Sequence, residues 1–416
     1  MERIVLTKNI ADGPQTFDEY VAEGGYQALD RALAGSPQDV LNAVTESHLR
    51  GRGGAGFPTG QKWGFTASEE ATPKYVVANG GEDEPGSQKD RVVMENAPHR
   101  LIEGVLLASY AIGASEAILY VNSQYSVAHQ RLEEAIARAV DAGYLGKLGM
   151  SLRIHPAPQE YVAGEDTASL EVIEGRKPLP RVKPPFPVSK GLFGSPTIVN
   201  NVETFAYIPA IVAKGPEWFR SQGSEDNPGT MLFTLPANVR NPGVVELPIG
   251  TSLRELIEVH GGGLASGKGI KAVLPGGPSS GFLRGDDLDV AMDRQTLMER
   301  GSALGCGVLR IIEEGECIVE VADDIAQFFA REQCGQCPAC TMETNTLAKI
   351  TSQIRAGAGS PALLDQIPKL GAFAKGKGQC SLISMPIPPL TTAIRLFADD
   401  FTYHLEHHGC WAAAQS

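Results

Sequence analysis

The sequence predicts a multidomain α/β protein that ends in a helical part carrying the cysteines. Helix-like and strand-like segments alternate over about the first 225 residues, short strand-like segments follow to about residue 320, and helix-like segments then continue to the end. All seven cysteines lie from residue 306 onward. A chain of 416 residues is long enough for roughly two or three domains. We therefore expect domains over residues 1–229, 230–321 and 322–416.

The expected elements follow from periodicity and from turn residues. In the first part, helices are expected over residues 37–49, 99–114 and 127–146, and strands over residues 74–80, 116–121 and 151–156. Ser36 is a favourable N-cap and Pro37 suits the first helical position. The five prolines of residues 176–188 exclude regular structure, so this segment is expected to be an ordered arm or a linker.

The middle and last parts differ in pattern. Strands are expected over residues 230–239, 243–250, 270–277 and 307–322, with one helix over residues 251–261. This combination predicts a small α+β module. Helices are then expected over residues 322–333, 344–357 and 389–408, which together predict a small helical bundle.

A glycine-rich stretch, GRGGAGFPTG, occupies residues 51–60. Its glycines match the G-x-G-x-x-G pattern of dinucleotide-binding proteins, but that pattern requires a strand before it and a helix after it. Here a helix is expected before it, and Pro58 disfavours a long helix after it. A Rossmann-type loop is therefore not expected at this position.

The same glycines can still serve a ligand. Backbone without side chains approaches a phosphate or a flat cofactor closely, and Arg52 and Lys62 add positive charge. Phe57 and Phe65 at the end of the stretch suit stacking against a ring. A mobile surface loop is the alternative interpretation.

Two acidic loops point to hydroxyl groups. Glu82, Asp83 and Glu84 directly follow an expected strand, where α/β sheets place ligands. Carboxylates there accept hydrogen bonds from ribose or ribityl hydroxyls and repel a 2′-phosphate, which favours NAD over NADP. A solvated acidic turn is the alternative. Glu165 and Asp166 form a second acidic loop after Gly164, and Asn200 and Asn201 offer amides that suit the edge of a flavin ring.

The cysteines predict a metal centre. Cys334, Cys337 and Cys340 in CGQCPAC can each bind one corner of a [4Fe–4S] cluster, which we favour over zinc because zinc sites usually use two separated C-x-x-C pairs. The chain lacks the x3-C-P continuation of bacterial ferredoxins, so the fourth ligand must lie elsewhere. Cys380, in the glycine-rich turn GKGKGQCSL, is the best candidate.

The remaining cysteines lie in other settings. Cys306 and Cys317 occupy apolar runs and are expected to be buried core thiols. His404, His407 and His408 with Cys410 could form a second metal site, but a charged helix that frays near the terminus explains them adequately, and we expect these histidines to be structural.

Composition excludes several classes of partner. The net charge of −13 argues against nucleic acid or an anionic membrane as the main partner. No stretch approaches the ~20 apolar residues that cross a bilayer, so we expect no direct membrane insertion. The first residues, MERIVLTKNIADG, lack the core of a signal peptide, and a cytoplasmic protein is expected.

These motifs together resemble a known family. LRGRGGAGFPTGQKW, EPGSQKDR, GEDTASLE, KPPFPVSKGLFGSPTIVNNVET and CGQCPAC with a remote cysteine, in this order, are similar to the NADH-binding flavoprotein subunit of respiratory complex I. The same family includes diaphorase subunits of NAD-reducing hydrogenases and of NAD-dependent formate dehydrogenases. The resemblance covers about residues 45 to 385.

The resemblance implies cofactors, domains and site residues. It implies FMN, one [4Fe–4S] cluster and NADH as substrate, in a flavin-binding α/β domain, a ubiquitin-like β-grasp (SLBB) module and a cluster-bearing helical bundle. By position, the implied FMN residues are Gly51, Arg52, Gly53, Lys62, Asn79, Glu82, Gly164, Glu165, Asn200 and Asn201. The implied NADH residues are Phe57, Phe65, Glu84, Asp166 and Phe186. Glu84 is expected to orient the nicotinamide.

The sequence departs from the family pattern at three places. Gly81 replaces the first acid of N-x-D-E-x-E-P-G, Asp166 replaces a glutamate, and residues 341–343 read TME in place of the usual REG. The implied activity is an NADH dehydrogenase that passes electrons to a separate ferredoxin or to an iron–sulfur partner subunit. The alternatives are a diaphorase subunit within a complex I, formate dehydrogenase or hydrogenase assembly, and a β-grasp scaffold that has lost its flavin.

Overall fold

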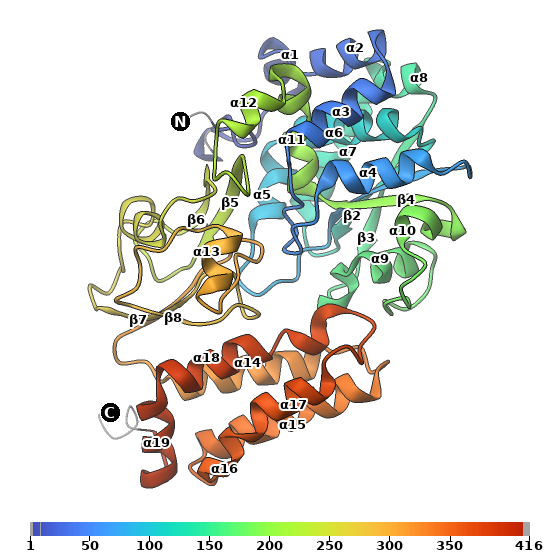
Figure 1. Cartoon of the computed structure of the whole chain (residues 1–416). Helices are drawn as coiled ribbons and strands as arrows, with labels where there is room; N and C mark the ends of the chain where they lie inside the picture. Colours follow the sequence, from blue (N-terminus) through green and yellow to red (C-terminus); the bar gives the residue numbers. More distant parts are fainter. Residues whose placement is uncertain (1–2, 9, 411–416) are drawn as a thin grey trace. The chain divides into compact units, whose positions relative to one another are not determined.

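The computed structural model of the protein describes residues 3–8 and 10–410 (Figure 1). The chain divides into two compact units. The first comprises Met1–Phe233 with Val244–Ile249, and the second comprises Thr234–Gly243 with Gly250–Ser416. The three-domain boundaries expected from the sequence stay a prediction.

The first unit is built around a four-stranded parallel sheet in the order β3-β2-β1-β4. Its strands are β1 (Tyr75–Gly80), β2 (Glu116–Asn122), β3 (Ser151–Ala157) and β4 (Thr197–Asn201). The chain proceeds from β1 through β2 to β3 on one side of β1, whereas β4 lies on the other side. The strand order thus reverses between β1 and β4, and open α/β sheets bind ligands at the carboxyl ends of the strands beside such a reversal.

Both faces of this sheet are buried, because alternate side chains of each strand enter two different cores. Val76 and Leu119 join the larger core, whereas Val77 and Tyr120 join a smaller core that includes Leu170. The larger core contains side chains of α3 (Pro37–Glu46), α6 (Pro98–Ile112), α7 (Ser126–Asp141) and α11 (Val202–Lys214), and the smaller one those of α9 (Asp166–Ile173). The α/β layer architecture expected from the sequence is confirmed.

The glycine-rich loop lies between two helices, α3 and α4 (Thr59–Ser68). The expected helix before the loop is confirmed, but the expectation that Pro58 prevents a long helix after it is wrong, because α4 runs for 10 residues. Pro58 occupies the N-cap position with φ of −59°. A residue there needs no N–H for an intrahelical bond, so proline does not oppose the helix.

The proline-rich segment is an ordered arm. Residues 176–186 contain no helix or strand, and the short helix α10 (Pro187–Lys190) follows. The guanidinium of Arg181 binds Glu171 and Glu174 on the adjacent part of the chain. The other elements of the first unit are η1 (Ile10–Asp12), α1 (Phe17–Ala22), α2 (Gln27–Ala34), α5 (Lys89–Asn96), α8 (Tyr144–Leu148), η2 (Tyr161–Gly164), η3 (Leu192–Gly194) and α12 (Pro216–Arg220).

The middle of the chain forms two small sheets. β5 (Thr230–Leu235) pairs with β6 (Gly243–Pro248), and a three-stranded antiparallel sheet has the order β8-β7-β9. Its strands are β7 (Ile270–Leu274), β8 (Leu283–Arg284) and β9 (Arg310–Glu313), accompanied by η4 (Glu255–His260) and α13 (Arg294–Glu299). The expected short strands are therefore present, but two helical elements, η4 and α13, accompany them where one helix was expected, and η4 is a π-helical turn.

The end of the chain is helical. Its elements are α14 (Ile318–Glu332), α15 (Pro338–Arg355), α16 (Pro361–Leu364), α17 (Gln366–Ala374), η5 (Ser381–Ser384), α18 (Ile387–Leu396) and α19 (Ala398–His407). The strand expected over residues 307–322 is wrong beyond Glu313. Ile318, Val321 and Ile325 are spaced so that they share one helix face, and their burial outweighs the strand preference of β-branched residues.

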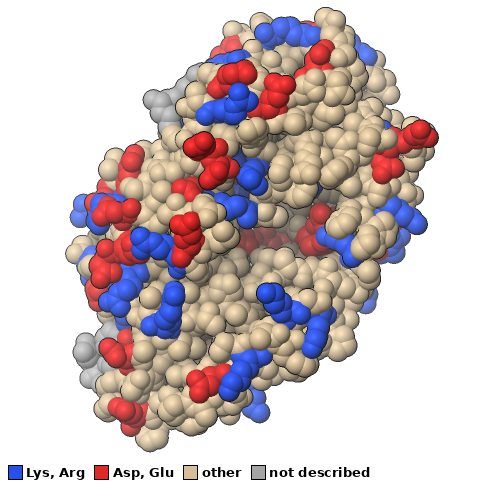
Figure 2. Space-filling model, in the orientation of Figure 1, with Lys and Arg blue, Asp and Glu red and all other residues tan. Residues whose placement is uncertain are grey.

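Charges are distributed over the surface. Figure 2 shows Lys and Arg side chains interspersed with Asp and Glu side chains on the face in view. Within the described residues, no helix has the length and apolar character that crossing a bilayer requires.

Candidate functional site

The predicted polar residues gather at the carboxyl ends of β1 and β4. Ala78 pairs with Asn200 and Asn79 pairs with Asn201 in the sheet. The Asn79 amide donates through Nδ2 to the carbonyl of Gly164 at 2.8 Å. The second acidic loop is therefore tied to the end of β1, beside the reversal in strand order.

Asn200 is oriented by Trp63, a contact that the sequence did not indicate. The indole Nε1 of Trp63 donates to Oδ1 of Asn200 at 3.0 Å, and Trp63 is fully buried. Because an indole N–H can only donate, the amide oxygen of Asn200 must face it. Within the described residues Nδ2 of Asn200 makes no hydrogen bond, so its two N–H groups remain for a ligand.

Asn201 is placed differently. Its Nδ2 donates to Asp90 Oδ2 at 2.7 Å and to the Asn79 carbonyl at 3.3 Å. Its Oδ1 accepts from Lys89 Nζ and from the Glu203 amide, each at 3.0 Å. An asparagine amide has two donors and two acceptor positions, and all four are used. Asn201 therefore holds the end of β4 in place instead of offering its amide to a ligand.

The glycine-rich loop packs tightly against this strand end. A Cβ on Gly53 would lie 3.2 Å from Cβ of Asn201, and Gly54 has a φ of +100°. Glycine is favoured at both positions, because a side chain at Gly53 would crowd Asn201 and one at Gly54 would strain the backbone.

The Arg52 side chain points into the core. The guanidinium of Arg52, which is 2% exposed, donates to Asn227 Oδ1 at 3.1 Å and to the Pro228 carbonyl at 2.9 Å. The backbone N–H of Arg52 donates to Thr204 Oγ1 at 2.9 Å. Arg52 therefore anchors the glycine-rich loop, and its charge is used inside the protein.

Lys62 on α4 supplies positive charge. Its Nζ donates to the carbonyl of Val199 on β4 at 3.0 Å. Burial lowers the pKa of Lys62, and the charge of Asp166 acts in the opposite direction. At the start of the same helix, the buried hydroxyl of Thr59 has no hydrogen-bond partner within the described part of the chain. A helix start with an unused hydroxyl after a glycine-rich loop suits an anionic group.

Glu82 stabilises the first acidic loop through hydrogen bonds of its buried carboxylate. Its carboxylate accepts from the hydroxyl of Ser87 and from the backbone N–H groups of Asp90 and Arg91, at 3.1 and 3.0 Å. Burial, with the charge of Asp90, raises the pKa of Glu82 to about 7. These bonds hold the loop against the start of α5.

Glu84 lies further along this loop and is half-buried. Burial raises the pKa of Glu84 to about 7, and a hydrogen bond with the side chain of Tyr161 partly opposes this shift. A carboxyl group with a shifted pKa in a polar site is a candidate functional residue. Tyr161 comes from the segment η2 and had no signal in the sequence.

The second acidic loop pairs with the proline-rich arm. Lys183 Nζ lies 2.6 Å from a carboxylate oxygen of Glu165 and 2.6 Å from one of Asp166. Burial alone would raise the pKa of Asp166. The hydrogen bond with Glu165 and the charge of the Lys183 ammonium together lower it by more, so that the pKa of Asp166 falls to about 2. Glu165 also caps α9 by accepting from the amide N–H groups of Thr167 and Ala168 at 2.8 Å. Lys183 was missed because a lone lysine among prolines carries no pattern.

The three predicted stacking residues have large exposed rings. Phe57, Phe65 and Phe186 are 44%, 47% and 54% exposed. Phe193, which the sequence did not single out, is 57% exposed and has a φ of +51°. Exposed aromatic rings are available for contact with a planar ligand. The ring of Phe193, however, packs against Tyr75 at the amino end of β1 and not at the carboxyl ends of the strands.

The CGQCPAC cysteines surround the start of α15. Cys337 is the N-cap residue of α15, and Cys340 lies in its first turn. The pKa of the Cys340 thiol is raised to about 12, first by burial and then by the charges of Cys380, Cys337, Glu343 and Cys334. The thiol of the remote Cys380 is therefore among the groups that act on Cys340.

A contact between two glutamines also joins the CGQCPAC segment to the segment that carries Cys380. The Gln336 amide donates to the side chain of Gln379, which directly precedes Cys380.

Of the other cysteines, Cys317 is buried as expected, whereas Cys306 is only half-buried in a turn, so the expectation of a core thiol is wrong there. A turn glycine on each side, Gly305 and Gly307, explains why Cys306 does not continue a strand.

Three family models match successive parts of the chain. The Nuo51 FMN-binding domain matches residues 44–210, the SLBB domain residues 237–283, and the NADH-ubiquinone oxidoreductase-F iron-sulfur binding region residues 320–404. The chain is 42% identical over 415 residues to an F-type subunit of the NADH-quinone oxidoreductase of Rhizobium meliloti (strain 1021), covering 98% of both chains. It is 40% identical to the NADP-reducing hydrogenase subunit HndC of Solidesulfovibrio fructosivorans, covering 95% of this chain and 82% of that one.

A solved structure is also similar. The chain matches a subunit in the crystal structure of an NAD+-reducing [NiFe]-hydrogenase in the H2-reduced state, with a TM-score of 0.85 and 32% identity. The match covers 95% of this chain and 66% of that longer chain. The chain therefore belongs to the family of F-type subunits of NADH-quinone oxidoreductases, as its motifs predicted, and is an oxidoreductase with an FMN-binding domain, an SLBB domain and an iron–sulfur region.

Proposed function

We propose that the protein oxidises NADH and delivers the electrons singly to a separate protein acceptor. When bound, FMN accepts a hydride from NADH and releases electrons one at a time, and a [4Fe–4S] cluster relays single electrons. The observation that carries the proposal is the convergence of Asn200, Lys62 and the second acidic loop at the reversal between β1 and β4.

The residues present fit a flavin mononucleotide. The amide N–H groups of Asn200 are available to an acceptor on a ring edge, while Thr59 and Lys62 suit a phosphate. Around them we assign the FMN site to Gly51, Arg52, Gly53, Lys62, Asn79, Glu82, Gly164, Glu165, Asn200 and Asn201. Within this set, Arg52, Glu82 and Asn201 act through the backbone that they position.

For NADH we propose Phe57, Phe65, Glu84, Asp166 and Phe186. The exposed phenylalanine rings supply stacking surface, and the carboxylates accept hydrogen bonds from hydroxyl groups or from the carboxamide. Tyr161 orients Glu84, and Lys183 holds Asp166. Hydride transfer needs no acid or base from the chain, so these residues orient the substrate and exclude NADPH.

Four thiols fit an iron–sulfur cluster. Cys334, Cys337, Cys340 and Cys380 provide the thiolate donors that such clusters use, and their electrostatic influence on Cys340 supports one common site. These four cysteines belong to the second compact unit, whereas the proposed flavin site belongs to the first. A ferredoxin is the acceptor that we propose.

The experiment is anaerobic mixing of purified protein with NADH. A flavin spectrum that bleaches, followed by an EPR signal of a reduced cluster, is expected; a chain without flavin would instead support a scaffold. The acceptor is tested by adding a ferredoxin to the isolated chain. Reduction of ferredoxin by the chain alone supports the proposal, whereas co-purification with stoichiometric iron–sulfur partners and no reduction without them supports an assembly subunit.

A further inference from the structure

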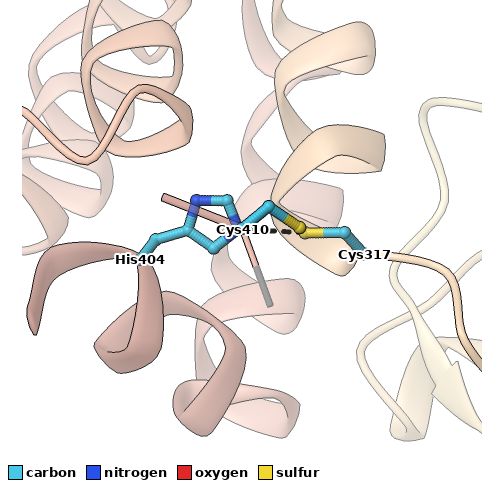
Figure 3. Close-up of side chains that lie close together, drawn as sticks. All are labelled: Cys317, His404 and Cys410. Atoms are coloured by element: carbon cyan, nitrogen blue, oxygen red, sulfur yellow. Dashed lines mark hydrogen bonds between the residues drawn. The ribbon is translucent and has the colours of Figure 1, made fainter. Parts of the chain in front are cut away.

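A second group of metal-ligand side chains lies in the helical region, apart from the CGQCPAC motif. The ligand atoms of Cys317, His404 and Cys410 all lie within 4.8 Å of one another (Figure 3). Cys317 is the N-cap residue of α14, His404 is on α19, and Cys410 follows α19. Cys317 and His404, which are 87 residues apart in sequence, thus converge on one point with Cys410.

A backbone carbonyl holds the imidazole of His404 through its Nδ1 atom. Its Nδ1 lies 3.1 Å from the backbone carbonyl of Arg355, which can only accept, so Nδ1 carries the hydrogen. In the neutral ring Nε2 then has a free lone pair, and it lies 3.1 Å from Sγ of Cys317. A ring nitrogen held by a backbone carbonyl while the other faces the ligand position is typical of metal-binding histidines. His404 is fully buried, contrary to the expectation of a frayed surface helix.

The position of Cys410 is also held by packing. His408 Nδ1 lies 2.9 Å from the carbonyl of Gly357. A Cβ on Gly357 would lie 2.3 Å from Cα of His408, so only glycine permits this close approach. The segment that carries Cys410 is therefore packed against the end of α15, which brings its thiol to the buried pair.

We propose that Cys317, His404 and Cys410 bind one zinc ion. Two thiolates and an imidazole are typical zinc ligands, and tetrahedral Zn–S and Zn–N bonds of about 2.3 and 2.1 Å place ligand atoms roughly 3.6 to 3.8 Å apart. The observed cluster can reach these separations with small movements of side chains. Zinc binding displaces one proton from each thiol, and both protons leave to solvent.

The fourth ligand of the proposed zinc ion would be a water molecule. Cys317 and His404 are buried, whereas Cys410 is half-buried, so the open side of the cluster is the side of Cys410. Oδ2 of Asp400 accepts hydrogen bonds from Lys271 Nζ at 2.6 Å and from the Ile318 amide at 3.1 Å. The ion would join α19 and the segment after it to the start of α14, the helix that leads into the CGQCPAC motif.

The experiment measures zinc, iron and FMN per chain in the purified holoprotein. The expected result is about one zinc beside about four irons, with X-ray absorption at the zinc edge showing two sulfur neighbours at about 2.3 Å. Cys410→Ser and His404→Gln should lose the zinc and retain iron and FMN. Cys306→Ser, which changes a half-buried cysteine elsewhere, should retain all three.

Three results would overturn the proposal. One is wild-type protein without zinc that takes up none from one equivalent of zinc chloride. Another is zinc that persists in both variants, which would locate it at other ligands. The third is a disulfide between Cys317 and Cys410 in the freshly purified protein, seen as a cross-linked peptide pair. The zinc content and the X-ray absorption of the wild type decide the question even if the variants fold poorly.

Discussion

The indole N–H of Trp63 donates a hydrogen bond to the side-chain oxygen of Asn200 at 3.0 Å. This bond determines which end of the Asn200 amide is turned toward the proposed FMN site. Asn200 can then act toward a flavin only as a donor, because its oxygen is occupied. If Asn200 binds FMN as proposed, Trp63 contributes to that binding without lining the site.

Replacing Trp63 by phenylalanine tests this relationship. Trp63→Phe keeps an aromatic ring in the core but removes the N–H, so Asn200 is free to turn its oxygen toward the flavin. Loss of one oriented hydrogen bond of about 1 kcal/mol should weaken FMN binding roughly fivefold. Fluorescence titration of the deflavinated protein measures this change. Trp218→Phe is the control, because Trp218 contacts Lys214 away from the sheet, and an equal loss in both variants would argue against the role of Trp63.

The raised pKa of Glu84 predicts a pH dependence. Because the pKa is about 7, the group is protonated and neutral below that pH and becomes a carboxylate above it. Only the carboxylate accepts two hydrogen bonds from NADH, so KM for NADH should fall as the pH rises from about 6 to about 8. Glu84→Gln should abolish this fall, and Glu84→Ala should lower NADH turnover, while FMN remains bound in both.

The control for Glu84 is Glu46→Gln, since Glu46 is exposed on the surface of α3. It should retain the pH profile of the wild type. Steady-state kinetics at constant ionic strength provide the measurement. A wild-type KM that is flat across this range, or an unchanged profile in Glu84→Gln, would remove Glu84 from the NADH site.

The pairing of Lys183 with Glu165 and Asp166 predicts how the protein discriminates against NADPH. The wild type should prefer NADH strongly, because net negative charge repels a 2′-phosphate. Lys183→Met removes the cation between the two carboxylates and should raise the NADH-to-NADPH ratio of kcat/KM. Asp166→Asn should lower the ratio, by about tenfold for a change of one close charge.

Arg176→Met is the matched control for Lys183→Met. It removes one positive charge from the same arm, but Arg176 is exposed and binds Glu171 and Glu174. The ratio should stay close to that of the wild type. If Arg176→Met and Lys183→Met changed it equally, the general charge of the arm and not the specific ion pair would be responsible.

The fold was predictable where local pattern and burial agree. The strands β1, β2 and β3 and the helices α3 and α6 follow from continuous apolar or 3.6-residue patterns that tertiary packing reinforces. The start of α14 was not predictable in this way, because Ile318, Val319 and Val321 favour a strand locally and only their burial selects the helix. The reversal in strand order between β1 and β4 also has no local signal.

The candidate site was predictable as a set of motifs but not as a network. Asn200 and Glu165 stand out as polar residues in the motifs of the sequence. Trp63 acts on Asn200 from 137 residues away and Lys183 on Glu165 from 18 residues away, and such pairings have no signature in one sequence. The inward direction of the Arg52 side chain is likewise set by a partner, Asn227, that lies 175 residues away.

The fourth ligand of the cluster is the remaining prediction. Cys380 acts on the pKa of Cys340 together with Cys334 and Cys337, and Gln379 beside it is bonded to Gln336 within the motif. Three cysteines on one turn leave the fourth iron of a cubane without a protein ligand. Cys380→Ser should therefore lose or degrade the cluster, with less bound iron and an altered EPR signal in the reduced state.

The flavin should be unaffected by this change, because Cys380 lies outside the first unit that contains the proposed flavin site. Cys380→Ser should bind FMN, accept hydride from NADH and reduce an artificial two-electron oxidant at the wild-type rate, while one-electron delivery to a protein acceptor collapses. Cys306→Ser should retain the cluster and both activities. If Cys380→Ser kept four irons and a native signal while Cys306→Ser lost them, the ligand assignment would be wrong, because replacing a thiolate ligand by serine changes the donor atom on iron and alters the signal of the cluster.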